Sequence, residues 1–184
     1  MLYVKRDQLQ AGTRRPYAEL VVERMASGLE PPLSELFNPA AFLIPVPGAG
    51  LTRPNTVWPA LSICRALHKS GLGASPATVL RRARAVPKSA GSQNRPLLHE
   101  HYESFTVQGT LDHPTRIVLV DDVVTSGTTL MAGARRLKDA FPRAAIAAFA
   151  LARVWSSGEP PVLFEPLIEQ VVVAGARCRR EPQS

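Results

Sequence analysis

An apolar run over residues 117–120 is followed at once by two acids, Asp121 and Asp122, and then by a loop of small residues. Each residue of the run is apolar, as expected of a strand that is buried on both faces, and such strands are typical of parallel sheets. After the loop, residues 128–141 have a helical pattern that stops at Pro142. A buried strand that leads through a short loop into a helix is a unit of the α/β class, and it restricts the fold more than any other feature of the chain.

The rest of the chain continues this alternation of helices and strands. Helical patterns cover residues 16–29 and 55–71; in the second, Asn55 or Thr56 fits the N-cap and Pro59 fits only the first turn. With 184 residues and 45% hydrophobic content, the chain can bury one full core, so we expect a single domain. The expected fold class is therefore α/β, with a mostly parallel central sheet flanked by helices. Apolar segments predict further strands over residues 41–46, 77–82, 104–107, 146–151 and 170–175.

The cysteines and the apolar runs exclude several classes of protein. Cys64 and Cys178 stand far apart and no CxxC pair is present, which argues against a structural zinc site and a disulfide framework. Cys64 is expected to be a small core residue of its helix. The first residues contain no apolar stretch long enough for a signal peptide, and the longest apolar run, residues 144–152, is too short to span a bilayer. We therefore expect a cytoplasmic protein with no membrane partner.

The positive charge of the chain is concentrated in about one third of the sequence. The net charge is +7, and residues 36–99 contain eight Lys and Arg residues and no Asp or Glu. The remainder, with 14 cations and 15 anions, is close to neutral. A positive field of this kind favours an anionic ligand, either a nucleic acid or a polyphosphate. A solvated basic face is the simpler alternative.

The loop Thr125–Thr129 has the composition of a phosphate site. Gly127 allows the backbone to approach a ligand closely, the following helix offers unpaired N–H groups at its positive end, and four hydroxyl side chains add donors. These groups together suit a phosphomonoester without a lysine. Asp121 and Asp122 would repel a phosphate, but they can accept hydrogen bonds from the hydroxyls of an adjacent ribose. The order of residues predicts a sugar phosphate at the carboxyl end of the strand, with helix capping and surface solvation as the alternative role of the acids.

The segment IVLVDDVVTSGTT, residues 117–129, resembles the signature with which type I phosphoribosyltransferases bind 5-phosphoribosyl pyrophosphate (PRPP). Neither of the common nucleotide-binding loops, G-x-x-x-x-G-K-[ST] and G-x-G-x-x-G, is present. Over about residues 42–154 the layout is similar to the ComF-like branch of that family. The N-terminal cysteine-rich zinc module of that branch is absent, and its Asn-Gln pair reads Asn55-Thr56 here. The segments that carry this second resemblance are Pro45-Val46-Pro47, Arg53-Pro54-Asn55 and Arg81-Arg82-Ala83-Arg84.

The resemblance implies a type I phosphoribosyltransferase-like fold and a role for each matching residue. Asp121 and Asp122 would bind the ribose hydroxyls and hold Mg²⁺, mainly through water and PRPP. The loop that contains Arg53 would face the pyrophosphate, and residues 86–95, with Lys88, would form a lid that closes over the reacting centre. The implied catalytic residues are Arg53, Lys88, Asp121 and Asp122, and the implied PRPP-binding residues are Pro47, Gly48, Arg53, Asp121, Asp122, Val123, Val124, Thr125, Ser126, Gly127, Thr128 and Thr129.

The activity that the resemblance implies is transfer of a 5-phosphoribosyl group from PRPP to a nitrogenous acceptor, with release of pyrophosphate. The acceptor, which no pattern identifies, would bind under a small hood formed by residues 1–38 and 155–184 around a core of about residues 40–154. Several members of this fold are regulators, so a non-catalytic PRPP- or nucleotide-binding regulator, or a ComF-like accessory factor in DNA uptake, is the alternative. Nucleic-acid binding by the basic segment is a third possibility. By analogy with the fold, we expect a homodimer.

Residues 86–101 lack periodicity and are expected to form a mobile surface loop. Within them, His99-Glu100-His101 has the composition of half a metal site. No third ligand lies nearby in the sequence, so we interpret these three residues as part of a solvated loop.

Overall fold

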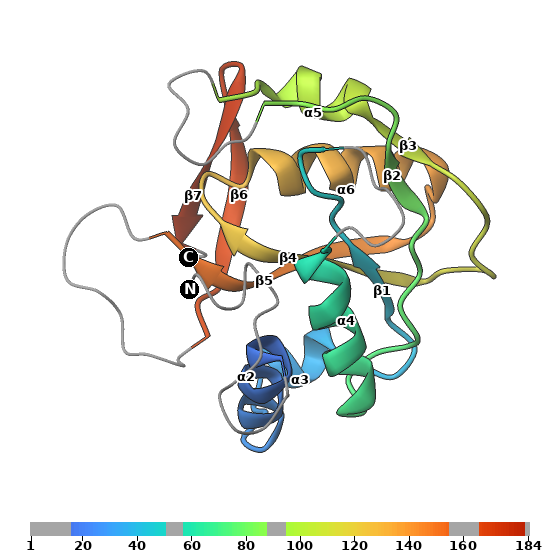
Figure 1. The fold of residues 1–184 in the computed structure, drawn as a ribbon, viewed down its shortest axis with the longest axis vertical. Coiled ribbons are helices and arrows are strands. Elements are labelled where there is room, and N and C mark those ends of the chain that lie inside the picture. The colour runs from blue at the N-terminus through green and yellow to red at the C-terminus, as the bar shows by residue number, and fades with distance from the viewer. Residues whose placement is uncertain (1–15, 51–56, 88–94, 155–165, 183–184) are drawn as a thin grey trace.

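The computed structural model describes residues 16–50, 57–87, 95–154 and 166–182. Its centre is a parallel three-stranded sheet in the order β1-β4-β5 (Figure 1). In the register of this sheet, Leu119 lies between Ile44 and Ala148. The predicted α/β class, with a parallel central sheet flanked by helices, is confirmed. The strands of the sheet are β1 (Phe42–Pro45), β4 (Arg116–Val124) and β5 (Ala145–Arg153).

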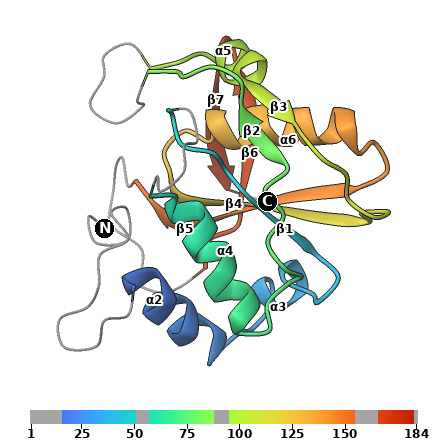
Figure 2. The same ribbon diagram turned by 45° about the vertical axis from the view of Figure 1, so that its right-hand side comes forward.

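Helices cover both faces of the sheet (Figure 2). Helix α4 lies on one face together with α2 and the short α3, and α6 lies on the other. Val118 and Val120 of β4 join the apolar cluster beneath α4, whereas Ile117 and Leu119 join the cluster beneath α6, as the alternation of strand side chains requires. All four side chains are fully buried, which explains the unbroken apolar run. The helices are α2 (Tyr17–Ala26), α3 (Leu33–Leu36), α4 (Pro59–Lys69) and α6 (Thr128–Ala140).

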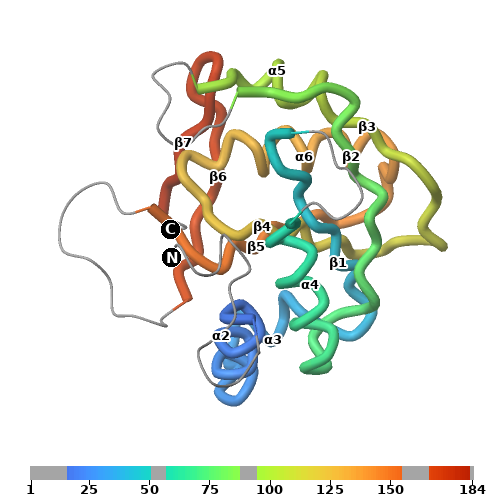
Figure 3. Tube along the Cα trace, in the orientation of Figure 1, coloured from blue at the N-terminus to red at the C-terminus, as the bar shows by residue number. Residues whose placement is uncertain are grey.

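Further elements gather on the α6 side of the sheet (Figure 3). β2 pairs antiparallel with β3, and α5 leads directly into β3. β6 and β7 form an antiparallel pair whose β7 strand reaches the start of α6, where the backbone N–H of Cys178 donates to Oγ1 of Thr128 at 3.1 Å. These elements are β2 (Leu80–Arg82), α5 (Leu98–Ser104), β3 (Phe105–Val107), β6 (Glu169–Ala174) and β7 (Arg177–Pro182).

Several expected elements lie where the sequence places them. Pro59 is the first residue of α4, as its fixed backbone geometry requires, and Gly71 just beyond that helix has a φ of 78°. Asn55 and Thr56, the expected caps, lie outside the described residues. Cys64 is fully buried in the cluster beneath α4, which confirms its role as a core residue.

The strand that carries the two acids is longer than the sequence suggests. Its apolar run ends at Val120, yet β4 continues for four residues more. The extension forms because β5 runs beside it: Asp121 pairs with Ala150, and Val124 pairs with Arg153. The acids are therefore part of the sheet and do not follow it.

One further expectation is wrong, and one strand was not predicted. Residues 98–101, expected in a surface loop, belong to α5, and the Leu97 N–H at the start of this helix donates to the Glu100 carboxylate at 2.6 Å. The strand predicted over residues 170–175 is confirmed as β6, but it pairs with an additional strand, β7, in a separate antiparallel sheet. The partner strand was missed because its sequence, RCRREP, has no apolar pattern.

The described parts of the expected hood lie on opposite faces of the sheet. Ala18, Val22 and Phe37, from α2 and the segment after α3, belong to the apolar cluster beneath α4. The β6–β7 pair lies on the side of α6. A hood built jointly by both ends of the chain stays a prediction, as does the division into one core and one hood. Within the described residues, none of the helices has the length and apolar character needed to cross a membrane.

Candidate functional site

The carboxyl end of β4 is open on one side. β1 ends at Pro45, opposite Val120, and one last backbone bond joins Val46 N–H to Val120 O at 2.8 Å. Beyond that point the chain turns away into the loop that contains Pro47 and Gly48, and β4 continues with β5 alone. Asp121 therefore lies where a sheet edge opens at the carboxyl end of parallel strands, the usual position of ligands in α/β proteins.

The two acids leave β4 on different faces. Continuing the alternation from Ile117 and Leu119 places Asp121 on the α6 face, and Asp122 on the α4 face. One carboxylate oxygen of Asp121 accepts a hydrogen bond from the backbone N–H of Asp122 at 2.9 Å. The charge of Asp121 also acts on the buried guanidinium of Arg82, whose pKa it raises against the effect of burial. A ligand that lies across the open edge would meet both carboxylates.

The loop that follows β4 depends on a glycine for two separate reasons. Gly127, the N-cap of α6, has a φ of 83°, a left-handed conformation that side chains other than glycine rarely adopt. A Cβ at this position would also lie 2.8 Å from both Cγ atoms of Val171 in β6. Glycine thus allows the loop to turn into α6 and lets the β6–β7 pair pack directly against it.

The hydroxyls of the loop are shared between the loop itself and the hairpin. Oγ of Ser126 and Oγ1 of Thr128 lie 2.9 Å apart, and Oγ of Ser126 also accepts a long hydrogen bond of 3.4 Å from the Thr128 N–H. Thr128 is buried and binds the backbone of Cys178, as described above. Thr125 and Thr129 are half-buried. One hydroxyl therefore anchors the hairpin while its neighbours face the space in front of the helix.

That space is a cavity of about 180 Å³. It combines hydroxyl side chains at the positive end of α6 with two arginines, one from the segment before α5 and one from β7, and none of the described residues that line it is an acid. The arginine from β7, Arg177, donates to the backbone carbonyl of Arg95 at 3.1 Å, so the two cationic segments are joined to each other. This combination of donors and positive charge suits an anion. The lining residues are Arg95, Pro96, His101, Thr125, Ser126, Thr128, Thr129 and Arg177.

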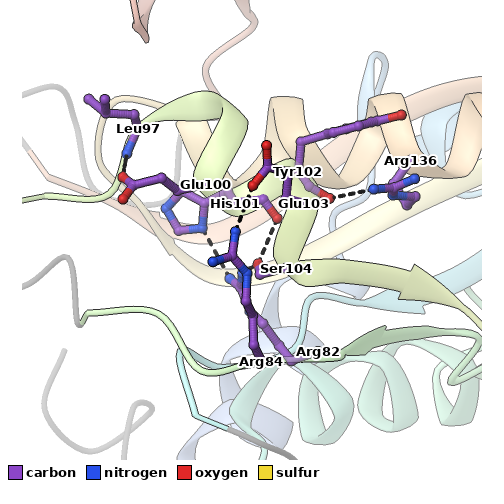
Figure 4. A network of polar contacts seen from close by, with 9 residues as sticks. All are labelled: Arg82, Arg84, Leu97, Glu100, His101, Tyr102, Glu103, Ser104 and Arg136. Carbon is purple, nitrogen blue, oxygen red and sulfur yellow. Dashed lines mark hydrogen bonds and ion pairs between the residues drawn. The ribbon is translucent and has the colours of Figure 1, made fainter.

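A buried arginine connects this cavity with the loop after β1. Arg82 is 6% exposed; its Nε donates to Gly48 O at 3.1 Å, and its Nη1 donates to the hydroxyl of Ser104 (Figure 4). Its guanidinium lies 3.9 Å from the centre of the Phe105 ring. Burial lowers the pKa of Arg82 to about 10, so the side chain remains charged at neutral pH. Arg82 was noticed in the sequence only as part of a basic segment, whereas in the fold it fixes the position of the Gly48 loop.

The third partner of Arg82 is a histidine that lines the cavity. Nη2 of Arg82 lies 3.1 Å from Nδ1 of His101, and Nε2 of the same ring lies 3.4 Å from Oγ1 of Thr129. Burial, and then the charge of Arg82, lower the pKa of His101 to about 4, while Glu100 opposes the shift. The ring is therefore neutral at pH 7. His101 is 3% exposed, so its interpretation as a solvated loop residue is wrong.

The fold brings part of the predicted site together. Four loop residues line one cavity, and Asp121, Asp122, Val123 and Val124 lead to it along β4. Gly48 is held by Arg82, and the neighbouring Ala49 carbonyl accepts from Val86 N–H at 2.9 Å.

Arg53 and Lys88, predicted to be catalytic, lie outside the described residues. The sequence interpretation did not include His101 or Arg177 in the site.

The described residues offer no ready-made metal centre. Among them, no group of three or more His, Cys, Asp or Glu side chains is placed to hold a metal ion. Asp121 and Asp122 supply carboxylate oxygens of the kind that Mg²⁺ prefers, but two such groups leave most of its coordination sphere to other ligands. The donor set therefore fits a magnesium ion whose remaining ligands are water and an anionic substrate.

The chain has a low level of similarity to solved structures of other proteins. No family model matches the chain, and no curated protein matches it either. A solved structure of hypoxanthine phosphoribosyl transferase from Trypanosoma cruzi aligns with 76% of this chain and 73% of its own. The sequence identity is 15% and the TM-score is 0.37. Likeness at this level assigns neither a family nor an activity, so the function has to be argued from the residues of the site.

Proposed function

We propose that this protein binds PRPP at the carboxyl end of β4 and transfers its 5-phosphoribosyl group to a nitrogenous acceptor, with release of pyrophosphate. One observation carries the proposal. The loop with the PRPP-type sequence lines a small cavity whose described lining includes two arginines and no carboxylate, directly beyond a pair of acids at an open sheet edge. Both halves of a sugar phosphate have matching groups there, and they occur in the order that the ligand requires.

The cavity would hold the 5-phosphate. Hydroxyls of Thr125, Ser126 and Thr129 and backbone N–H groups of the first turn of α6 would donate to its oxygens. Arg95 and Arg177, which also line the cavity, would add positive charge. A phosphate gains more from such charged donors than from neutral ones.

The open edge would hold the ribose and the pyrophosphate. Asp121, on the face of the cavity, would accept hydrogen bonds from ribose hydroxyls, and Asp122 would approach the same ligand from the other face. The loop with Pro47 and Gly48 lies beside this edge, so the pyrophosphate would lie against it and against Arg53. Asp121 and Asp122 would hold Mg²⁺ together with water and PRPP oxygens, and the ion would neutralise charge on the pyrophosphate.

A regulator that binds PRPP without turning it over is the competing function. It is favoured by the fact that the described cavity provides groups suited to binding an anion. A ComF-like accessory role in DNA uptake belongs to the same alternative. The two functions differ in one observable, the release of pyrophosphate.

The test measures pyrophosphate release and calorimetric PRPP binding side by side, across purine, pyrimidine and amine acceptors. In an enzyme, Lys88→Ala should lower turnover about ten- to a thousandfold, equivalent to about 1.4–4 kcal/mol, with a smaller effect on PRPP affinity. The reason is that leaving-group charge grows as the glycosidic bond breaks, so a cation there stabilises the transition state most. Lys69→Ala is the matched control, because this exposed lysine pairs with Glu19 on the other face of the sheet. Tight PRPP binding without release of pyrophosphate from PRPP in the presence of any of these acceptors would assign the protein to the regulators.

A further inference from the structure

The cavity contains one donor that the loop sequence does not supply, the imidazole of His101. Arginine carries only donors, so the 3.1 Å contact between Arg82 Nη2 and Nδ1 of His101 requires Nδ1 to be the acceptor. A neutral ring that accepts at Nδ1 carries its proton on Nε2. The hydrogen bond from Arg82 thereby determines which nitrogen of His101 can donate.

The protonated nitrogen is on the cavity side of the ring. Nε2 lies 3.4 Å from Oγ1 of Thr129, which is long for a hydrogen bond, and both residues line the cavity. A buried donor with only a long contact gains from a better acceptor within reach. An oxygen of an anion in the cavity would be such an acceptor.

We propose that His101 is an anion-binding residue of this cavity, a neutral Nε2–H donor that acts beside Thr129, and that Arg82 is the positioning residue that fixes its tautomer. The proposal deepens the function argued above, because the anion would be the 5-phosphate of PRPP. It also joins the two halves of the site, since the same guanidinium holds Gly48 through Nε and His101 through Nη2.

The charges around the ring favour the neutral form. Arg82 reaches it from β2, and Arg95 and Arg177 line the same cavity. Glu100, on the same helix, is the acid that acts on it. A positive charge on His101 would be added to these three cations, and the low pKa described above agrees with this. The donor should therefore work equally well from about pH 5.5 to pH 8.

Two substitutions separate the two nitrogens. In His101→Asn, the amide can still accept from Arg82 near the position of Nδ1, but nothing donates into the cavity. In His101→Gln, the longer amide can place an N–H near the position of Nε2. Because hydrogen bonds to charged partners are strong, His101→Asn should weaken sulfate binding about ten- to a hundredfold, and His101→Gln should lose no more than about threefold. Sulfate is the probe because its charge is constant over this pH range.

His99→Gln is the matched control. His99 lies two residues away on the exposed side of α5, where it lines a different groove together with Tyr102 and Arg135. Its replacement should leave sulfate affinity unchanged.

Equal affinity for sulfate in wild type, His101→Asn and His101→Gln would overturn the proposal. A wild-type affinity that rises about tenfold or more between pH 8 and pH 5.5 would also overturn it, because such a rise is the sign of a histidine that acts as a cation.

Nitrogen-15 NMR of the wild-type histidines gives an answer that does not depend on the folding of a variant. The spectrum should show His101 with a bare Nδ1 and a protonated Nε2 at neutral pH, and its Nε2–H resonance should shift as sulfate saturates. In Arg82→Lys, which cannot keep the same set of hydrogen bonds, the ring should populate both tautomers. A protonated Nδ1 in the wild type, or an Nε2–H resonance that does not shift at saturating sulfate, would refute the assignment.

Parallel titrations with PRPP and ribose 5-phosphate distinguish the two proposals. If His101→Asn weakens sulfate binding but the wild type binds neither PRPP nor ribose 5-phosphate, the anion site stands and the proposed function fails. If it binds PRPP and His101→Asn binds it equally well, the proposed function stands and the role of His101 fails.

Discussion

The two faces of the β1-β4-β5 sheet are covered in different ways. On the α4 face the buried side chains are apolar, from Val22 of α2 to Ile63 and Leu67 of α4, and they form one cluster with Val118 and Val120. On the α6 face the apolar cluster continues into a layer of buried polar groups. Every buried polar or charged residue among those that the structure describes lies on that side: Arg82, His101, Ser104 and Thr128.

The difference separates what stabilises the fold from what specifies a ligand. Apolar packing is favourable whatever the partner, whereas a buried polar group is tolerated only where its hydrogen bonds are made. Arg82 meets that condition with Gly48, Ser104 and His101. Substitutions on the α4 face should therefore change stability alone, whereas substitutions on the α6 face should change both stability and binding.

The largest effect is expected on the α4 face. Ile63 is fully buried there, and Ile63→Ala should lower the free energy of unfolding by about 2–5 kcal/mol, through lost burial and the cavity that remains. Sulfate affinity of the folded variant should stay within about twofold of wild type. Urea unfolding and calorimetry measure the two quantities, and a tenfold loss of sulfate affinity would mean that the faces are not separate.

A pH dependence of stability is expected from the α6 face. The pKa of His101 is about 4 in the fold and about 6.5 in the unfolded chain, so the unfolded state binds the proton more readily in between. The stability contributed by the neutral ring is complete above about pH 6.5 and is lost as the pH falls towards 4, by up to about 3 kcal/mol. Urea unfolding at several pH values should show this slope in wild type and a shallower one in His101→Asn. Identical slopes would contradict the buried, neutral state of the ring.

Replacement of Gly127 tests whether the loop contributes both to the stability of the protein and to anion binding. Gly127→Ala places a Cβ in a left-handed conformation and within 2.8 Å of Val171, so we expect a loss of about 1–3 kcal/mol in unfolding free energy. Sulfate binding should weaken in the same variant, because the loop and the hairpin both have to move. As a control, Gly28→Ala has nothing within 4 Å of its Cβ and should affect neither quantity by much. Normal sulfate affinity in Gly127→Ala would show that the loop geometry does not matter for the anion.

The smallest effect distinguishes the two acids. Asp121→Asn removes a charge that acts on buried Arg82, whereas Asp122 points to the other face. Asp121→Asn should therefore lower the free energy of unfolding by about 1 kcal/mol more than Asp122→Asn at neutral pH. Chemical denaturation of the two single variants measures the difference. If Asp122→Asn is the more destabilising substitution, the assignment of faces is wrong.

The parallel core could be predicted because the elements that form it carry recognisable local sequence patterns. β4 is apolar at four consecutive positions, and Pro59 fixes the start of α4. The elements that were missed are stabilised from a distance. The sequence of α5 is LHEHYES, and two of its polar residues, His101 and Ser104, can be buried because Arg82 of β2 binds both. β7 is held by its pairing with β6 and by Thr128, 50 positions away along the chain.

The same distinction applies to the candidate site. The acids and the loop are contiguous in the sequence, so their order alone suggested a sugar phosphate. His101 reaches Thr129 across 28 positions, and Arg177 belongs to a strand with no apolar pattern. One local signal was available, since the Glu100 carboxylate lies three residues after the Leu97 N–H that it accepts from, as at many helix starts. It would have predicted α5, though not the burial of His101.

The most direct test of the account is thermal melting of the protein with PRPP and Mg²⁺. A ligand that binds only the native state raises the melting temperature by mass action, so the wild type should melt at a higher temperature with PRPP and Mg²⁺ than without. The double variant Asp121→Asn/Asp122→Asn should remain folded without ligand and lose that shift. An equal shift in the double variant, or none in the wild type, would contradict the assignment of PRPP to the carboxyl end of β4.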